Sequence, residues 1–129
     1  MTPIIITHQI SDRRIADLLC GAFEGGSNYW IQSVKAVEPV QDGKPWDDEY
    51  TPSYIRAPFS TGGHLEVYVN EDDFSVPIRS LNRAALAKGL TLMAEHSARH
   101  FNDFLNEADD ADTADVFLQY CLFGDVIFS

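Results

Sequence analysis

The sequence predicts a single α+β domain in which a small, mainly antiparallel sheet is packed on one face by three or four helices. The chain has 129 residues, which is the usual size of one domain. Its periodic segments follow the order strand, helix, strands, helices, strand, which is typical of this class. No internal repeat divides residues 1–129, although residues 38–63 form a long loop rich in proline and glycine.

The first 37 residues predict a strand, a helix and a second strand. Residues 3–8 are a β-branched run typical of an opening strand. Ser11 is expected to cap the helix that follows, and Gly25 is expected to close it in the left-handed conformation. Residues 28–37 alternate as a strand does. The helix is indicated by apolar residues at the spacing of one helical face, namely Ile15, Leu18, Leu19, Ala22 and Phe23.

The loop at residues 38–63 interrupts this regular pattern. It contains four prolines, a pair of glycines and the acidic segment WDDEY at residues 46–50. A short edge strand is expected near residues 54–59. A loop of this length within a compact domain is often functional or mobile.

The second half predicts one strand, three helices and a terminal strand. Residues 64–73 alternate cleanly, and a helix capped by Ser80 follows. A helix capped by Asp112, with Asp115 at its third position, is expected to end at Gly124 before a strand at residues 125–129. The inward residues expected on the three helices are Leu86, Leu90, Met93 and Ala94, then Phe101, Phe104 and Leu105, then Val116, Phe117, Tyr120 and Cys121.

Charge is the most informative bulk property. Twenty acidic residues against nine basic ones give a net charge of −11 at pH 7. Such a surface disfavours direct binding to nucleic acid or to an anionic membrane, and it favours a protein partner with a basic surface. Mimicry of nucleic acid is therefore one interpretation, and simple solubility is the alternative.

Other features indicate a cytoplasmic protein. No apolar run is long enough to span a bilayer, and the N-terminal segment lacks the basic region of a signal peptide. Cys20 and Cys121 both lie within apolar helical patterns, so they are expected to be reduced and structural. These features leave open whether the protein forms a homo-oligomer.

Two sequence patterns suggest a metal site but match the known metal-binding motifs poorly. His96 and His100 are four residues apart, so on one continuous helix they share a face with Asp103. The zincin motif fails, because Ser97 follows the first histidine, and Ser97 is also able to cap a new helix. The acidic run at residues 106–115 lacks the glycine and glutamate of an EF-hand, and helix capping accounts for it.

No pattern predicts an enzyme or a cofactor. The acids of residues 46–50 and 69–73 lack an accompanying nucleophile or phosphate cradle. The segment GAFEGGSNYW at residues 21–30 lacks the third glycine of a dinucleotide fingerprint and the lysine of a P-loop. It is read as a helix end that leads into a strand, with aromatic residues suited to a binding surface. The candidate binding residues are Asn28, Tyr29, Trp30, Trp46, Asp47, Asp48, Glu49 and Tyr50.

Two stretches carry a family resemblance. EGGSNYW after the first helix, and the patterns HFxDFL, DxxTADVFLQ and FGxVIF near the C-terminus, resemble a group of small uncharacterised proteins from tailed phages and prophages. The resemblance covers residues 15–31 and 83–128. It implies an accessory protein that acts in the cytoplasm of a bacterial host, and it assigns no activity and no functional residue.

Three functions compete on this basis. The preferred one is a phage accessory protein that binds a host or phage protein with a basic surface, as an inhibitor of a host defence or of a nucleic-acid-handling protein. The second is a small-molecule binding module formed by the 38–63 loop, with Tyr29 and Trp30 as walls. The third is a metal-dependent hydrolase built on His96, His100 and the acids.

Overall fold

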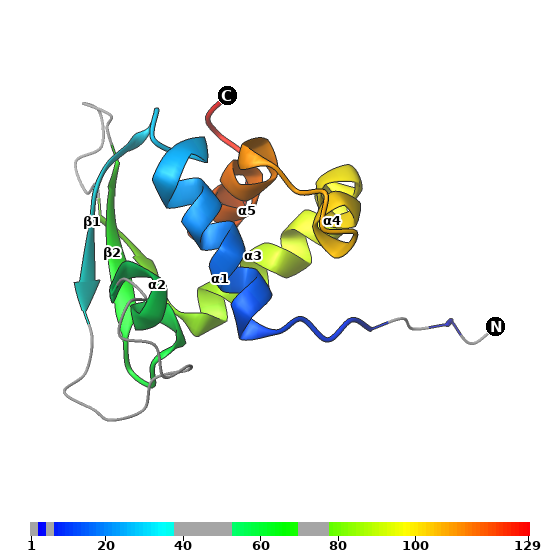
Figure 1. Ribbon diagram of the computed structural model, residues 1–129, viewed down its shortest axis with the longest axis horizontal. Coiled ribbons are helices and arrows are strands. Elements are labelled where there is room, and N and C mark those ends of the chain that lie inside the picture. Colours follow the sequence, from blue (N-terminus) through cyan, green and yellow to red (C-terminus); the bar gives the residue numbers. More distant parts are fainter. Residues whose placement is uncertain (1–2, 5–6, 38–52, 70–77) are drawn as a thin grey trace.

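The structure, a computed structural model, describes residues 3–4, 7–37, 53–69 and 78–129. The predicted α+β fold is confirmed: a three-stranded antiparallel sheet forms one layer and the longer helices lie together on one of its faces (Figure 1). The elements are α1 (Asp12–Gly21), the π-helical turn η1 (Ala22–Gly26), β1 (Ile31–Val37), α2 (Ser53–Arg56), the 3₁₀ turn η2 (Ala57–Phe59), β2 (His64–Val69), β3 (Ile78–Leu81), α3 (Arg83–His96), α4 (Ala98–Leu105) and α5 (Ala111–Phe123).

The sheet is a meander with the order β1-β2-β3. Val34 pairs with Val67, and Leu65 pairs with Leu81, so β2 is central. The predicted alternation in β2 is confirmed, since Leu65, Val67 and Val69 are buried and the residues between them are half-buried. One face of the sheet therefore belongs to the core.

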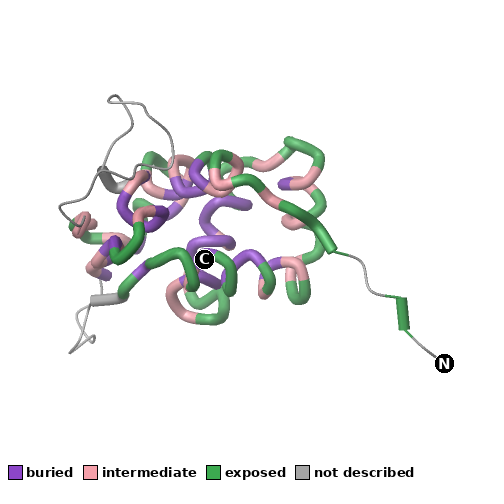
Figure 2. Tube along the Cα trace, turned by 90° about the horizontal axis from the view of Figure 1, so that it is seen from below, coloured by how far each residue is buried: buried purple, intermediate pink, exposed green. Residues whose placement is uncertain are grey.

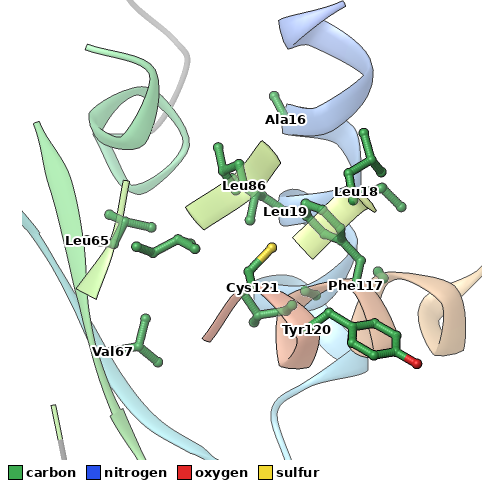
Figure 3. Close-up of a cluster of buried hydrophobic side chains, with 14 of the residues drawn as sticks. Ala16, Leu18, Leu19, Leu65, Val67, Leu86, Phe117, Tyr120 and Cys121 are labelled. Atoms are coloured by element: carbon green, nitrogen blue, oxygen red, sulfur yellow. The ribbon is translucent and has the colours of Figure 1, made fainter. Parts of the chain in front are cut away.

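Figure 3 shows where the core lies. Side chains from α1, α3, α5 and β2 meet between the sheet and the helices. The burial pattern along the chain agrees, because the buried residues concentrate inside the helical layer and the exposed ones lie around it (Figure 2). α3 and α5 approach so closely that a Cβ at Gly89 would overlap Cys121. Glycine at this position permits the contact between the two helices.

The end of α1 differs from the prediction. Ser11 caps α1 as expected, accepting a hydrogen bond from the backbone N–H of Arg14 at 3.2 Å. The predicted left-handed conformation of Gly25 is wrong, because among the described glycines only Gly62 and Gly124 have a positive φ. The helix widens instead into η1, where Ser27 N–H donates to the Ala22 carbonyl at 2.9 Å. At Gly26 a Cβ would overlap the Ala111 carbonyl oxygen, so glycine is required for close approach to α5.

Two predicted caps lie at the wrong residue. Asn82, not Ser80, caps α3 by accepting from Ala85 N–H at 2.9 Å. Asp110, not Asp112, caps α5 by accepting from Thr113 N–H at 3.0 Å. The left-handed Gly124 at the end of α5 is confirmed, with a φ of 75°. Cap prediction failed by two residues because several candidate cap residues follow one another in each segment.

Three predicted strands are absent from the described residues. The described part of residues 3–8 and the tail at residues 125–129 have no strand partner in the sheet. Residues 54–59 form α2 and η2, with Ile55, Ala57 and Phe59 buried, because Pro58 suits the first turn of a helix. β1 begins at Ile31 rather than at residue 28.

Candidate functional site

The SNYW turn, residues 27–30, converges on one carboxylate. Asp115 of α5 is 7% exposed, and its Oδ1 accepts hydrogen bonds from Ser27 Oγ at 2.8 Å and Trp30 Nε1 at 2.7 Å. Its Oδ2 accepts from the Tyr29 hydroxyl at 2.5 Å. Hydrogen bonds to a charged acceptor are short and strong, and here they satisfy an acid that is otherwise expensive to bury.

Trp30 lies in an aromatic cluster beneath this carboxylate. Its ring is 2% exposed and stacks on Phe128 with ring centroids 5.3 Å apart and an interplanar angle of 8°. Phe123 lies 5.4 Å from the same ring and contacts Phe128 edge-on. The C-terminal tail therefore covers the indole, which is not available as the wall of an open ligand pocket.

Gln119 fastens this tail, one helical turn after Asp115. Its Oε1 accepts from the backbone N–H groups of Ile127 and Phe128, each at 2.8 Å. Its Nε2 donates to the Phe128 carbonyl at 3.1 Å and, more weakly, to the Tyr29 hydroxyl at 3.5 Å. A side-chain amide thus replaces the strand partner that residues 125–129 lack, and we call this arrangement the Gln119 clasp.

These contacts argue for a structural role of the SNYW turn. Both oxygens of Asp115 accept hydrogen bonds from the turn, three in all, so this carboxylate holds the turn in place. Burial and the hydrogen bond to Asp115 raise the pKa of Tyr29 to about 12, so its hydroxyl stays protonated. The residues that sequence reasoning missed are Asp115 and Gln119. Their signal was a pair of polar residues four apart within the apolar segment of α5.

The candidate binding residues therefore separate. Asn28 is exposed and Tyr29 is 50% exposed, so both remain accessible at the surface of the turn. Trp30 is withdrawn into the core. The other candidates, Trp46, Asp47, Asp48, Glu49 and Tyr50, lie outside the described residues, as does most of the 38–63 loop.

The two histidines do not share a helix. α3 ends at His96 and α4 starts at Ala98, with Ser97 between them. His96 is exposed beside Glu95, whereas His100 Nδ1 lies 2.9 Å from the hydroxyl of Thr113. Among the described residues no three His, Cys, Asp or Glu side chains lie close enough to hold a metal ion. The pattern that suggested a shared metal face is broken by the turn at Ser97.

Neither cysteine is placed for nucleophilic catalysis. Cys121 is buried, and burial raises the pKa of its thiol. Cys20 is half-buried and donates to Glu24 at 3.0 Å, and this hydrogen bond raises its pKa to about 11. Both thiols are protonated at neutral pH, as the structural interpretation of the cysteines expects.

A concentration of carboxylates lies at the connection between α4 and α5. The acidic turn, as we call it, consists of Asp103, Glu107, Asp109, Asp110 and Asp112, and residues 103–112 contain no lysine or arginine. Glu107, Asp110 and Asp112 are exposed. The hydrogen bond from Thr113 N–H lowers the pKa of Asp110, which keeps this carboxylate ionised.

The backbone around the acidic turn is held from both sides. Arg14 of α1 donates to the carbonyl of Phe104, lies over the Phe104 ring at 4.5 Å and pairs with Asp109 at 3.3 Å. The Thr113 hydroxyl donates to Asp110 at 3.2 Å and contacts His100. Rigid elements on both sides thus present the exposed acids in a fixed arrangement.

A separate hollow of about 510 Å³ lies between α1, α3 and α4, and we call it the α1–α3 groove. This volume falls within the about 300–1,000 Å³ of ligand-binding clefts. Its polar rim includes His8, Asp12, Arg83, Thr91 and Glu95. Its apolar lining includes Ile10, Ile15, Phe59, Leu86, Leu90 and Phe101.

No helix within the described ranges is both long and apolar enough to cross a membrane. Comparisons of the chain with models of protein families, with curated proteins and with solved structures give no match.

Proposed function

We propose that this protein is a non-catalytic binding protein whose acidic turn engages a basic surface on a partner protein. The observation that carries the proposal is the concentration of acids at residues 103–112, in a segment without a basic residue. Like-charged side chains gathered on one surface create a field that attracts and orients an oppositely charged partner. The net charge of −11 extends this attraction beyond the contact itself.

The fixed backbone of the acidic turn supports the same function. Arg14 and Thr113 hold the turn from α1 and α5, so little conformational entropy is lost when a partner binds. Arg14 neutralises only part of the local charge, since it pairs with Asp109 while Glu107 and Asp112 face solvent. Such an arrangement suits a row of arginine or lysine side chains on a partner.

The resemblance to proteins of tailed phages limits the range of candidate partners. An accessory protein of this kind acts inside a bacterial host. We therefore propose a bacterial or phage protein with a basic surface, such as a host-defence or nucleic-acid-handling protein, as the partner. The acidic turn then occupies the surface that otherwise holds phosphates.

Capture from a bacterial lysate tests the proposal. The tagged protein is used as bait in about 0.1 M and about 1 M sodium chloride, where the Debye length falls from about 10 Å to about 3 Å. A partner bound through the acidic turn is retained in the first buffer and lost in the second. Retention that is indifferent to salt would contradict the proposal.

A matched pair of double variants locates the surface. Glu107→Gln with Asp112→Asn removes two exposed acids of the acidic turn, and Asp17→Asn with Asp125→Asn removes two exposed acids elsewhere. Both pairs change the net charge equally. The first is expected to weaken capture at least tenfold and the second by less than threefold, whereas equal losses would leave only a general effect of charge.

A further inference from the structure

The α1–α3 groove opens beside the start of the chain. His8 and Ile10, from the segment that leads into α1, contribute to its wall, and His8 packs edge-on against Phe101 with ring centroids 5.6 Å apart. The described residues before α1 then lead away from the helices (Figure 1). A single copy therefore presents an apolar groove and, next to it, a segment that leaves the groove.

That segment carries apolar side chains of its own. We call residues 3–10 the N-terminal arm; its sequence is PIIITHQI, and Ile4 is 90% exposed. Exposure of Ile4 and of the apolar lining of the groove is unfavourable for an isolated chain, because both surfaces contact water. Burial of one surface against the other satisfies both.

We propose that two copies of this chain exchange their N-terminal arms, so that Ile4 of each copy enters the α1–α3 groove of the other. The two contacts are equivalent, so they form a closed dimer with twofold symmetry. The described residues before α1 lead away from the helices of their own copy (Figure 1), which favours exchange between copies over burial within one copy. The exchange adds to the proposed function and uses a different surface.

The lengths of arm and groove agree. His8 and Ile10 belong to the wall of their own groove, so the free part of the arm runs from His8 to Ile4 and spans at most about 14 Å when extended, at about 3.4 Å per residue. The groove follows α3 from Leu86 to Glu95, which is about 14 Å at 1.5 Å per residue. The free part of the arm therefore matches the length of the groove along α3.

Charge also favours the arm as the occupant. Residues 1–11 contain none of the 20 acids of the chain, so a second acidic copy repels the arm less than it repels the acidic segments. At the groove, Arg83 forms a two-pronged ion pair with Asp12, with both distances 2.8 Å, and this neutralises an acid of the rim. The contact therefore joins an arm without acids to a groove in which Arg83 neutralises Asp12.

The oligomeric state of the full chain provides the first test. Light scattering after size exclusion is expected to give a concentration-dependent mass that approaches twice the 14.4 kDa of one chain. Ile4→Asp is expected to weaken dimerisation at least tenfold, whereas Gln9→Asp, with the same charge in the same arm, is expected to change it by less than threefold. A monomer at every concentration, or equal effects of the two variants, would overturn the proposal.

Variants of the groove provide a second, independent test. Ala87 is exposed and lines the groove, whereas Ala98 is exposed on α4 outside it. Arginine is a good helix former, so Ala87→Arg and Ala98→Arg are both expected to fold. Only the first is expected to abolish the dimer, because its side chain fills the groove. A dimer that persists in Ala87→Arg would overturn the proposal.

Disulfide trapping distinguishes exchange between copies from burial within one copy. Two differently tagged chains, both with Cys20→Ser, carry Ile4→Cys in one and Ala87→Cys in the other. The proposal predicts an intermolecular bond between them after mixing and oxidation, which requires Cα atoms within about 7 Å. In the chain that carries both substitutions, an intramolecular bond without a dimer would show burial within one copy and overturn the proposal.

Salt separates this inference from the proposed function. Dimers of an acidic chain are strengthened by salt, because screening reduces the repulsion between two copies that carry −11 each. Binding of a basic partner is weakened by salt. Each prediction is therefore able to fail while the other holds.

Discussion

Trp30 Nε1 donates to Asp115 Oδ1 at 2.7 Å, and this bond joins the turn after α1 to the middle of α5. The two residues are 85 positions apart in the sequence. The same oxygen accepts from Ser27, and the neighbouring one accepts from Tyr29. One carboxylate thus orders a turn, an aromatic cluster and the helix that carries it.

Asp115→Ala is expected to lower the free energy of unfolding by about 3 kcal/mol or more, because Ser27 and Trp30 would be left as buried donors without their acceptor. Asp115→Asn keeps one oxygen for these two donors, so a loss of about 1–2 kcal/mol is expected. Urea unfolding measures both values. Asp112→Ala, an exposed acid of the same helix, serves as the control and is expected to change stability by less than about 0.5 kcal/mol. Equal losses for Asp112→Ala and Asp115→Ala would contradict this account.

Gln119→Ala is expected to release the C-terminal tail and expose the Trp30 ring. The variant loses three hydrogen bonds to the backbone of the tail, at a cost of about 1–2 kcal/mol. Tryptophan fluorescence reports the change as a shift to longer wavelength. The measurement uses a Trp46→Phe background, which leaves Trp30 as the sole tryptophan of the two in the sequence.

The control for the clasp is Gln32→Ala, at an exposed position of β1. It removes the same side chain without touching the tail, so no spectral shift is expected. A Gln119→Ala spectrum identical to that of the control would show that aromatic stacking alone holds the tail.

The adjacent glycines of η1 predict opposite results for the same substitution. Gly26→Ala places a Cβ against the Ala111 carbonyl, so it is expected to destabilise the protein by about 1–3 kcal/mol. A Cβ at Gly25 meets nothing within 4 Å, so Gly25→Ala is expected to be neutral or stabilising by up to about 1 kcal/mol. Thermal unfolding of both variants tests the close contact between η1 and α5. A neutral Gly26→Ala would mean that this contact is looser than described.

The raised pKa of Tyr29 predicts that the protein loses stability in alkaline solution. Its pKa rises from the ordinary value of 10.0 to about 12 in the folded protein, so the neutral hydroxyl is favoured by folding. The contribution is complete below pH 10 and decreases as the pH rises from about 10 towards 12. Urea unfolding from pH 8 to pH 11.5 is expected to show a steeper loss for the natural chain than for Tyr29→Phe. If stability fell equally with pH in the natural chain and in Tyr29→Phe, the raised pKa of Tyr29 would be contradicted.

The sequence predicted the features that depend on local periodicity. The alternation of β2, the cap at Ser11 and the closure of α5 at Gly124 each follow from residues within a few positions of one another. The role of Asp115 does not. Its interpretation as a helix-capping acid failed because the cap is Asp110, which places residue 115 two positions further into the helix, where it receives hydrogen bonds from the SNYW turn.

The binding interpretation of Trp30 failed for a related reason. An aromatic residue after a helix end is suited either to a surface or to a core, and the deciding partners, Phe123 and Phe128, lie more than 90 positions later. Local propensity does not contain this information. The terminal strand failed because Gln119 meets the backbone groups of the tail that a strand would have offered to a sheet.

The pairing of the SNYW turn with α5 has a consequence for the order of folding. While the chain is synthesised, Trp30 leaves the ribosome long before Asp115, Phe123 or Phe128 exists to receive it. The apolar face of the sheet likewise waits for α3 and α5, and three strands gain little stability without that cover. Contacts so distant in sequence form slowly. Stable folding of this chain therefore awaits the synthesis of its last helix.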